Sequence, residues 1–517
     1  MQGKFDLGGP IDETGVFSYR LTGLVRDSDT QVDFVKDNRI YIAPALTWRP
    51  GKDTTLTVLG HFQRDETRPS QRLPAEGTLR SNPHGRIPTN RFTGEPNVDQ
   101  YDRDEFAVGY LLEHRISDAW TFRQNVRYYD NSVDDRTIFP TALLADQRTV
   151  SRALFESFGK VDGVTVDNQA QFQFATGAIR HTLLAGVDYQ LVNANSLQTF
   201  GAAPTLDIFN PAYGASVAAA PVFKNQDATE RQVGFYLQDQ IKFAEKWILS
   251  LGGRHDLATT KTMNKLTGGR TEQNDSAFTG RTGLVYLSDT GLAPYVSYAE
   301  SFLPVIGTDA ADVPFKPETG RQYEVGVKYQ PPGRNSFVTL AYFDLTRRNF
   351  LTSDPITFAN VQRGEARSRG LELEGVASFD FGLDLIASYT YLDAKVTESS
   401  FPAEVGEPLE YASKHKASLW ADYTIRGGDM KGWGLGAGVR HIGSSFGNSF
   451  GDRNTIKVPG ATLFDASVHY DWKQFRFAVN THNVFDKEYV ASAFTSGGEF
   501  ATFGQRRTVM GTVTYRF

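Results

Sequence analysis

The sequence predicts an all-β protein, a transmembrane antiparallel β-barrel, from three observations. Apolar and polar residues alternate with a period of two along many segments. Short and long connections follow each other in turn along nearly the whole chain. The last segment alternates in the same way and ends on an aromatic residue, Phe517. Together these observations favour a barrel with lipid outside and water inside over a soluble β-sandwich.

The alternation is clearest in three segments. In residues 322–329, Val325 lies on an apolar face and Glu324 on a polar face, and residues 370–379 and 419–425 repeat this division. In a β-strand, successive side chains point to opposite faces. We therefore expect one face of each strand to contact lipid and the other to face a water-filled lumen.

The lengths of the connections separate the two fold classes. Outer-membrane barrels have short periplasmic turns and long outer loops, whereas a sandwich has no reason to sort its loops by end. Short connections are expected at 50–53, 115–118, 177–178, 244–245, 288–291, 331–335, 380–381, 427–431 and 471–473. Long connections are expected at 68–98, 134–156, 195–228, 260–275, 303–318, 396–411, 446–456 and 483–504.

These boundaries give about 21 strands in a single domain that covers residues 1–517. The first connection is short and the last is long, so the first and last strands both run toward the periplasm. Bacterial barrels have an even number of strands, which predicts about 22 strands in the intact protein. No secretory signal follows Met1. We therefore expect an N-terminally truncated chain that lacks its first strand and the plug that fills barrels of this size.

Composition excludes several other classes of protein. Hydrophobic residues make up 40% of the chain, and no apolar run is long enough for a membrane helix. The 54 basic and 60 acidic residues give a net charge of −6, which argues against nucleic-acid binding. Cysteine is absent and the 9 histidines are scattered. Disulfides and thiolate metal sites are therefore excluded, and no metal site is expected.

Several motifs resemble one family over essentially the whole chain. Residues 483–489 (NVFDKEY), 504–507 (GQRR) and the terminal Phe517 look like the closing segment of TonB-dependent siderophore receptors. Residues 181–188 (HTLLAGVD) and 323–329 (YEVGVKY) resemble the ferrichrome (hydroxamate) branch of that family. These motifs are mostly structural, so they define the family better than they define the ligand.

The resemblance implies an outer-membrane receptor and transporter for ferric siderophores, of hydroxamate type. In this family a plug inside the barrel and a TonB-binding segment before it couple transport to TonB–ExbB–ExbD, and both parts are expected to be missing here. The implied partners are the ferric siderophore, outer-membrane lipid or lipopolysaccharide, and the barrel assembly machinery. Iron would enter only as part of the siderophore complex, so no cofactor is expected.

Four loop residues are candidate ligand contacts at the outer mouth. By position in the matching motifs, Phe200 and Phe494 correspond to aromatic contacts of the ferrichrome receptor, although each could instead pack a loop. Arg68 and Arg72 stand where the family has an aromatic cluster before Leu-Pro. The two arginines would favour an anionic ligand, such as a carboxylate-bearing siderophore, or would be solvated loop charges.

The last strand carries a candidate assembly signal in Tyr515 and Phe517. A terminal aromatic residue at the periplasmic interface fits a barrel strand and resembles the signal read by the assembly machinery, whereas the alternative is an ordinary edge strand.

Two other functions remain as alternatives. The first is a plugless passive channel or an engineered wide pore, which would conduct without a ligand. The second is an outer-membrane hydrolase, for which residues 443–447 offer a G-x-S-x-G match at Ser445. A nucleophile elbow needs a helix after the turn, and the residues that follow read as a loop. We therefore expect that the protein is not an enzyme.

Overall fold

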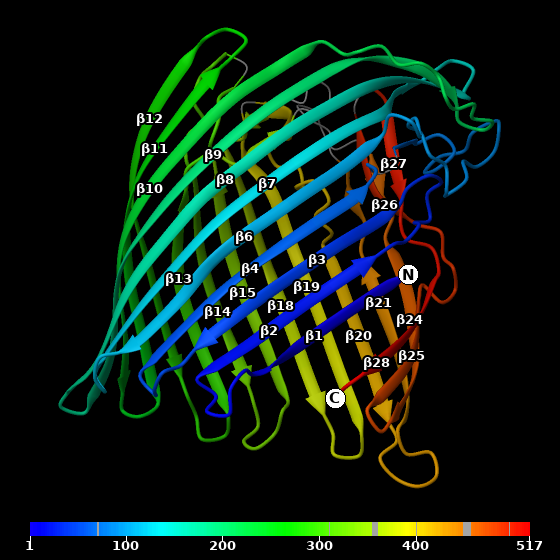
Figure 1. Cartoon of the computed structure of the whole chain (residues 1–517). Coiled ribbons are helices and arrows are strands. Elements are labelled where there is room, and N and C mark those ends of the chain that lie inside the picture. Colours follow the sequence, from blue (N-terminus) through cyan, green and yellow to red (C-terminus); the bar gives the residue numbers. More distant parts are fainter. Residues whose placement is uncertain (70–71, 310, 354–359, 400, 448–455, 496) are drawn as a thin grey trace.

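The computed structural model describes residues 1–69, 72–309, 311–353, 360–399, 401–447, 456–495 and 497–517. Its main element is one antiparallel sheet of 21 strands that curls into a barrel, with both chain ends on the same side (Figure 1). The strands of this sheet are β1 (Gln2–Pro10), β2 (Phe17–Arg26), β3 (Asp37–Trp48), β4 (Thr54–Thr67), β6 (Gln100–Arg115), β7 (Trp120–Leu143), β8 (Thr149–Thr176), β9 (Ile179–Asp207), β10 (Val222–Phe243), β11 (Trp247–Asn264), β12 (Arg270–Tyr286), β13 (Leu292–Leu303), β14 (Glu318–Tyr329), β15 (Phe337–Arg348), β18 (Glu365–Ser378), β19 (Leu383–Glu398), β20 (His415–Thr424), β21 (Trp433–Ile442), β24 (Ala461–Trp472), β25 (Phe475–His482) and β28 (Thr508–Tyr515).

Smaller elements lie in the connections. They are the three-stranded sheet β26–β27–β5 and the pairs β16–β17 and β22–β23. A 3-10 turn, η1, is the only helix in the described part of the chain. None of the described residues forms a helix long and apolar enough to cross a membrane. The bounds of these elements are β5 (Leu73–Pro74), β16 (Leu351–Ser353), β17 (Asn360–Gln362), η1 (Pro402–Glu404), β22 (Ser445–Phe446), β23 (Lys457–Val458), β26 (Val490–Thr495) and β27 (Glu499–Phe503).

The main sheet has 21 strands, as expected for this chain, but the expected fold class of a 22-stranded barrel without its plug is not supported. Each strand of the main sheet pairs with the next one along the chain, from β1 with β2 to β25 with β28. No ladder joins β1 to β28 in the described residues, so the structure has 21 strands. The number 22 came from the rule that bacterial barrels have an even number of strands. That rule applies to barrels whose first and last strands pair, and no such pairing is present in the described residues.

The strands of the wall divide their side chains between two faces. Tyr342 pairs with Val325 on one neighbouring strand and with Leu371 on the other, which makes a continuous apolar row. Three residues earlier on the same strand, Thr339 pairs in the same way with Lys328 and Glu374 in a polar row. Because paired residues of adjacent strands point to the same side, the apolar rows form the lipid face and the polar rows the lumen.

Strand lengths differ strongly around the barrel. β8 and β9 have 28 and 29 residues, whereas β25 and β28 have 8 each. About 10 tilted residues suffice to cross a bilayer. The tall strands therefore rise far beyond the membrane, on the side opposite the short turns at the lower end of Figure 1.

Several long connections are shorter than the sequence predicted. The expected loop 134–156 is reduced to residues 144–148, and the expected loop 195–228 to 208–221. Polar residues continue as paired strands there, because the ladder satisfies backbone groups in water as well as in lipid. Most of the expected loop 446–456 lies outside the described residues.

The wall has a gap between β12 and β13. β12 pairs with β11 from Arg270 to Tyr286, but it pairs with β13 only from Arg281 to Val285. Above this point the carboxylate of Glu300 accepts a hydrogen bond from the Gly280 amide at 2.9 Å, in place of a strand carbonyl. The upper part of β12 is therefore an open strand edge in the described structure.

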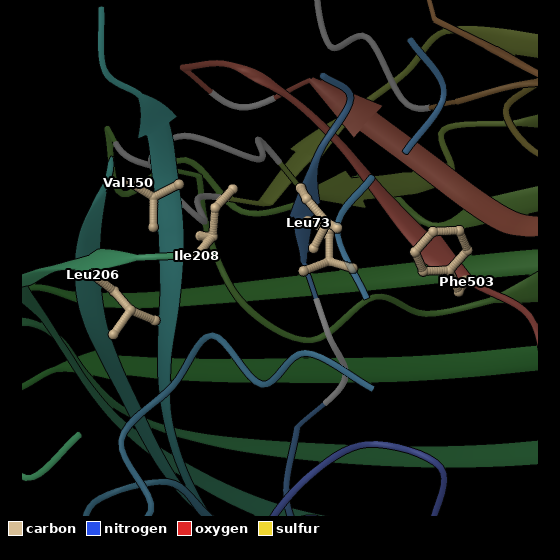
Figure 2. Packing of buried hydrophobic residues seen from close by; sticks show 6 residues of the cluster. Leu73, Val150, Leu206, Ile208 and Phe503 are labelled. Carbon is tan, nitrogen blue, oxygen red and sulfur yellow. The ribbon is translucent and has the colours of Figure 1, made fainter. Parts of the chain in front are cut away.

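The packed core lies at the outer end of the barrel. Leu73 and Ile208 are fully buried, and Figure 2 shows Ile208 between Val150 of β8 and Leu73 of the small outer sheet. The other members of this core cluster are Ile87, Val150, Leu206 and Phe503. In contrast, the wall residues Val325 and Leu371 are 53% and 43% exposed. The outer loops thus form a folded layer.

Candidate ligand-binding mouth

A small sheet brings distant loops together at the outer mouth. β27 pairs with β26 on one edge and with β5 on the other, so that Phe500 lies opposite Pro74 and Ala501 opposite Leu73. Leu73, Ala493 and Ala501 are fully buried, and their burial fixes these loops against β7. Hydrophobic packing therefore places the last long connection beside the loop that contains Arg72.

Three of the four predicted ligand contacts meet in one place, which we call the mouth cluster: Arg72, Phe139, Phe200, Phe494 and Phe500. The guanidinium carbon of Arg72 lies 4.1 Å from the ring centroid of Phe139 and 4.9 Å from that of Phe494. Phe200 lies 6.5 Å from Phe139, and Phe494 stacks on Phe500 at 5.7 Å. These distances allow cation–π attraction and aromatic packing to hold the cluster.

Two chemical properties coexist in the mouth cluster. Phe139 and Phe500 are buried and support the site, whereas Phe200 and Phe494 remain partly exposed. Burial lowers the pKa of Arg72 to about 10, so its side chain still carries a full positive charge at neutral pH. The cluster therefore offers apolar ring surface and one cation to a molecule that enters the mouth.

Arg68 does not join this cluster. Its guanidinium donates hydrogen bonds to the carbonyl oxygens of Asp99 at 2.9 Å and of Pro96 at 3.0 Å, and also to the carbonyl oxygen of Phe34. Arg68 therefore ties three outer segments together. Because its donors are used in these bonds, Arg68 serves to hold the loops together.

A buried ion pair fixes the loops beside the mouth. Arg152 and Glu95 are paired at 2.7 Å, and their side chains are 0% and 1% exposed. Arg152 also donates to three backbone carbonyls, and the second oxygen of Glu95 accepts the Gly214 amide at 2.8 Å. A buried charge is tolerated when it is paired and fully hydrogen-bonded, as here. The pair joins β8 to two outer loops.

Asp99 adds a titratable group to the same loop. Its two carboxylate oxygens accept the amides of Glu95 at 2.7 Å and Ile138 at 3.1 Å. Burial raises the pKa of Asp99 to about 7. The loop is therefore sensitive to pH in the neutral range.

The predicted assembly residues lie at the end of β28. The ring of Tyr515 is 4.9 Å from that of Phe475 and 5.9 Å from that of Phe517. Tyr515 is 52% exposed and Phe517 83% exposed. The two side chains form an open aromatic end on the final strand.

The candidate nucleophile Ser445 lies in a short strand pair at the outer end of the chain's fold. Ser445 lies in β22, which pairs with β23, and the residues that follow at 448–455 are outside the described part of the chain. In the residues that are described, no group of three or more histidine, aspartate or glutamate side chains is placed to hold a metal ion.

Sequence reasoning missed Phe139 and the Arg152–Glu95 pair. Phe139 lies within the expected loop 134–156, so its inward direction depended on a strand boundary that the sequence placed too early. The pair joins residues that are 57 positions apart, and no local pattern signals it.

A strand-only wall with an apolar outer face, short turns at one end and a packed mouth at the other defines an outer-membrane receptor barrel. The family model described as "TonB dependent receptor-like, beta-barrel" matches residues 47–484. This chain therefore belongs to the TonB-dependent receptor family, and it is an outer-membrane protein.

Named relatives extend this result. The ferrichrome outer membrane transporter/phage receptor of Escherichia coli K12 is 37% identical to this chain, over 100% of this chain and 72% of its own length. The ferrioxamine B receptor of Salmonella typhimurium SL1344 is 34% identical, over 99% of this chain and 73% of its own length. These relatives are transporters and receptors, not enzymes.

Solved structures show the same fold. The ferric-catecholate import receptor Fiu of E. coli K12 superposes with a TM-score of 0.87 at 21% identity, and the match covers 100% of this chain and 80% of Fiu. The siderophore receptor PiuA of Acinetobacter baumannii superposes with a TM-score of 0.86 at 20% identity, covering 99% of this chain and 79% of PiuA.

These matches correct the second part of the expected fold class. Solved receptors cover the whole of this chain, and the family match to 47–484 does not identify the chain as a barrel portion alone. The expected absence of a plug is therefore unsupported. It was inferred from the residues that stand at the start of the chain, and these carry no information about what precedes them.

Proposed function

We propose that the protein takes up ferric siderophores of hydroxamate type across the outer membrane, with energy supplied by TonB. The observation that supports this most directly is the mouth cluster, in which Phe200 and Phe494 present partly exposed rings beside a cation. A compact and partly apolar iron chelate suits such a surface. The ferrichrome and ferrioxamine B receptors among the relatives favour the hydroxamate class.

The proposal includes partners that follow from the family and from the wall. The TonB–ExbB–ExbD system would supply energy, outer-membrane lipid or lipopolysaccharide would cover the apolar rows, and Tyr515 and Phe517 would serve as the signal for the barrel assembly machinery. Iron is cargo in this scheme, carried in the siderophore complex.

Ligand binding by the purified chain in detergent micelles tests the proposal. We expect a neutral ferric trihydroxamate to bind with a Kd of about 1 µM or lower in isothermal titration calorimetry. Replacing Phe200 and Phe494 together by alanine should weaken binding at least about tenfold, because stacking area is lost. The matched control is Phe464→Ala, since Phe464 is a wall residue that is 44% exposed.

The same preparation distinguishes the passive channel. Large, ligand-independent conductance in planar bilayers, together with no binding of ferric hydroxamate, would favour a pore and contradict the proposed receptor. Tight binding that depends on the two phenylalanines would contradict the passive channel as the primary function.

A further inference from the structure

Arg72 is a cation that has no anionic partner among the residues that the structure describes. Among the described residues it makes no ion pair and no hydrogen bond, and its guanidinium lies over the rings of Phe139 and Phe494. Two other arginines beside the mouth are different: Arg152 is paired with Glu95, and Arg68 donates to three carbonyls. Arg68 and Arg152 therefore have a structural role in holding the loops, whereas no described residue neutralises the charge of Arg72.

The arrangement of Arg72 leaves its N–H groups available. Two phenyl rings lie close to its guanidinium. None of its nitrogens is fully buried without a hydrogen-bond partner, so its N–H groups can still be reached by a ligand. Asp135 lies in the neighbourhood without forming an ion pair with Arg72. Its carboxylate instead accepts the hydroxyl of Thr137 at 2.6 Å, and burial raises the pKa of Asp135. The protein thus holds the cation in place without neutralising it.

An arginine held in this way is suited to one kind of ligand group. The planar guanidinium presents paired donors that match the two oxygens of a carboxylate, and a partly desolvated site strengthens such a bond. The aromatic contacts restrict the rotation of the side chain before any ligand arrives, which reduces the entropy lost on binding.

We propose that Arg72 is the specificity-determining residue of the mouth and binds a free carboxylate on the ferric ligand. The substrate class is then a ferric hydroxamate that carries at least one carboxylate outside the iron coordination sphere. This inference rests on the proposed function. The apolar part of the chelate contacts Phe200 and Phe494, and the carboxylate reaches Arg72.

The test compares two probes on the full chain in detergent micelles: a neutral ferric trihydroxamate, and the same chelate with one added free carboxylate. We expect the wild-type protein to bind the carboxylate form at least about tenfold more tightly, which is the effect of a charge-assisted hydrogen bond. Arg72→Gln should reduce this preference to about one. Arg72→Lys, which keeps the charge but loses the paired donors, should retain about threefold.

A second outer-mouth arginine provides the matched control. Arg86 is 65% exposed and pairs with Glu488 at 3.3 Å, so Arg86→Gln removes the same charge without altering the mouth cluster. We expect this variant to keep the full preference. Equal loss in both variants would show a general charge effect and overturn the inference.

The outcomes separate this inference from the function on which it rests. Equal binding of the two probes by the wild-type protein, or a preference that survives in Arg72→Gln, would overturn the role of Arg72 and leave the receptor function standing. Failure to bind either probe would overturn the proposed function and this inference with it.

Discussion

The barrel wall and the outer mouth are stabilised in different ways. In the wall, the apolar residue Leu371 and its polar neighbour Glu372 are both exposed, because each strand is one layer thick. In the mouth, Leu73 and Ile208 are fully buried and Arg152 forms an internal ion pair. Strand ladders and lipid hold the wall, whereas side-chain packing holds the mouth. Substitutions in the mouth should therefore lower stability through lost side-chain packing, whereas substitutions in the wall should change mainly contacts with lipid.

The largest difference should appear when the buried ion pair is broken. Arg152→Met leaves Glu95 as an unpaired buried charge, and we expect it to destabilise the outer loops by about 3–5 kcal/mol. Hydrogen exchange of residues 92–99 and 208–214 measures this cost. Arg148→Met is the control, because its pair with Asp207 is 40% and 31% exposed and should contribute less than about 1 kcal/mol. Equal protection in both variants would contradict the role of the buried pair in holding the mouth.

Truncation of an apolar side chain should give an intermediate effect. Leu73→Ala creates a cavity in the fully packed layer under β27, and we expect a loss of about 3 kcal/mol. Leu371→Ala removes the same atoms from the 43% exposed lipid face, where neighbouring lipid fills the space. Protease resistance of the outer loops and thermal unfolding in detergent compare the two. A larger loss for Leu371→Ala would show that the wall is the more tightly packed region.

The smallest effect should come from pH. Burial raises the pKa of Asp99 in the folded protein to about 7, above its ordinary value, so the loop favours the protonated form. The resulting stability is complete at acidic pH below the unfolded pKa and is lost as pH rises through about 7. We expect residues 92–99 to exchange faster at pH 8 than at pH 6, after correction for the intrinsic rate. Asp99→Asn should remove this difference, and its persistence would assign the titration to another group.

The sequence was sufficient for the wall and insufficient for the mouth. Alternation of residues such as Glu324 and Val325 reports directly on which face contacts lipid, and short turns mark the strand ends. Phe200 and Phe494 were identified only through family resemblance, and their role in binding stays a prediction. Phe139 reaches the mouth cluster because the ladder between β7 and β8 extends that far. Arg68 stays outside the cluster because its guanidinium is hydrogen-bonded to backbone carbonyls. Such contacts depend on register and loop packing, which local patterns do not encode.

The open upper edge of β12 has a consequence for self-association. An unpaired strand edge can add strands from other copies of a protein and so seed insoluble aggregates. On β12 the exposed stretch carries Arg270, Glu272 and Asp275, and Glu300 occupies the Gly280 amide at its base. Charged side chains at such an edge act against stacking of a second copy. Neutralising these charges would therefore favour pairing of a second copy along the open edge of β12.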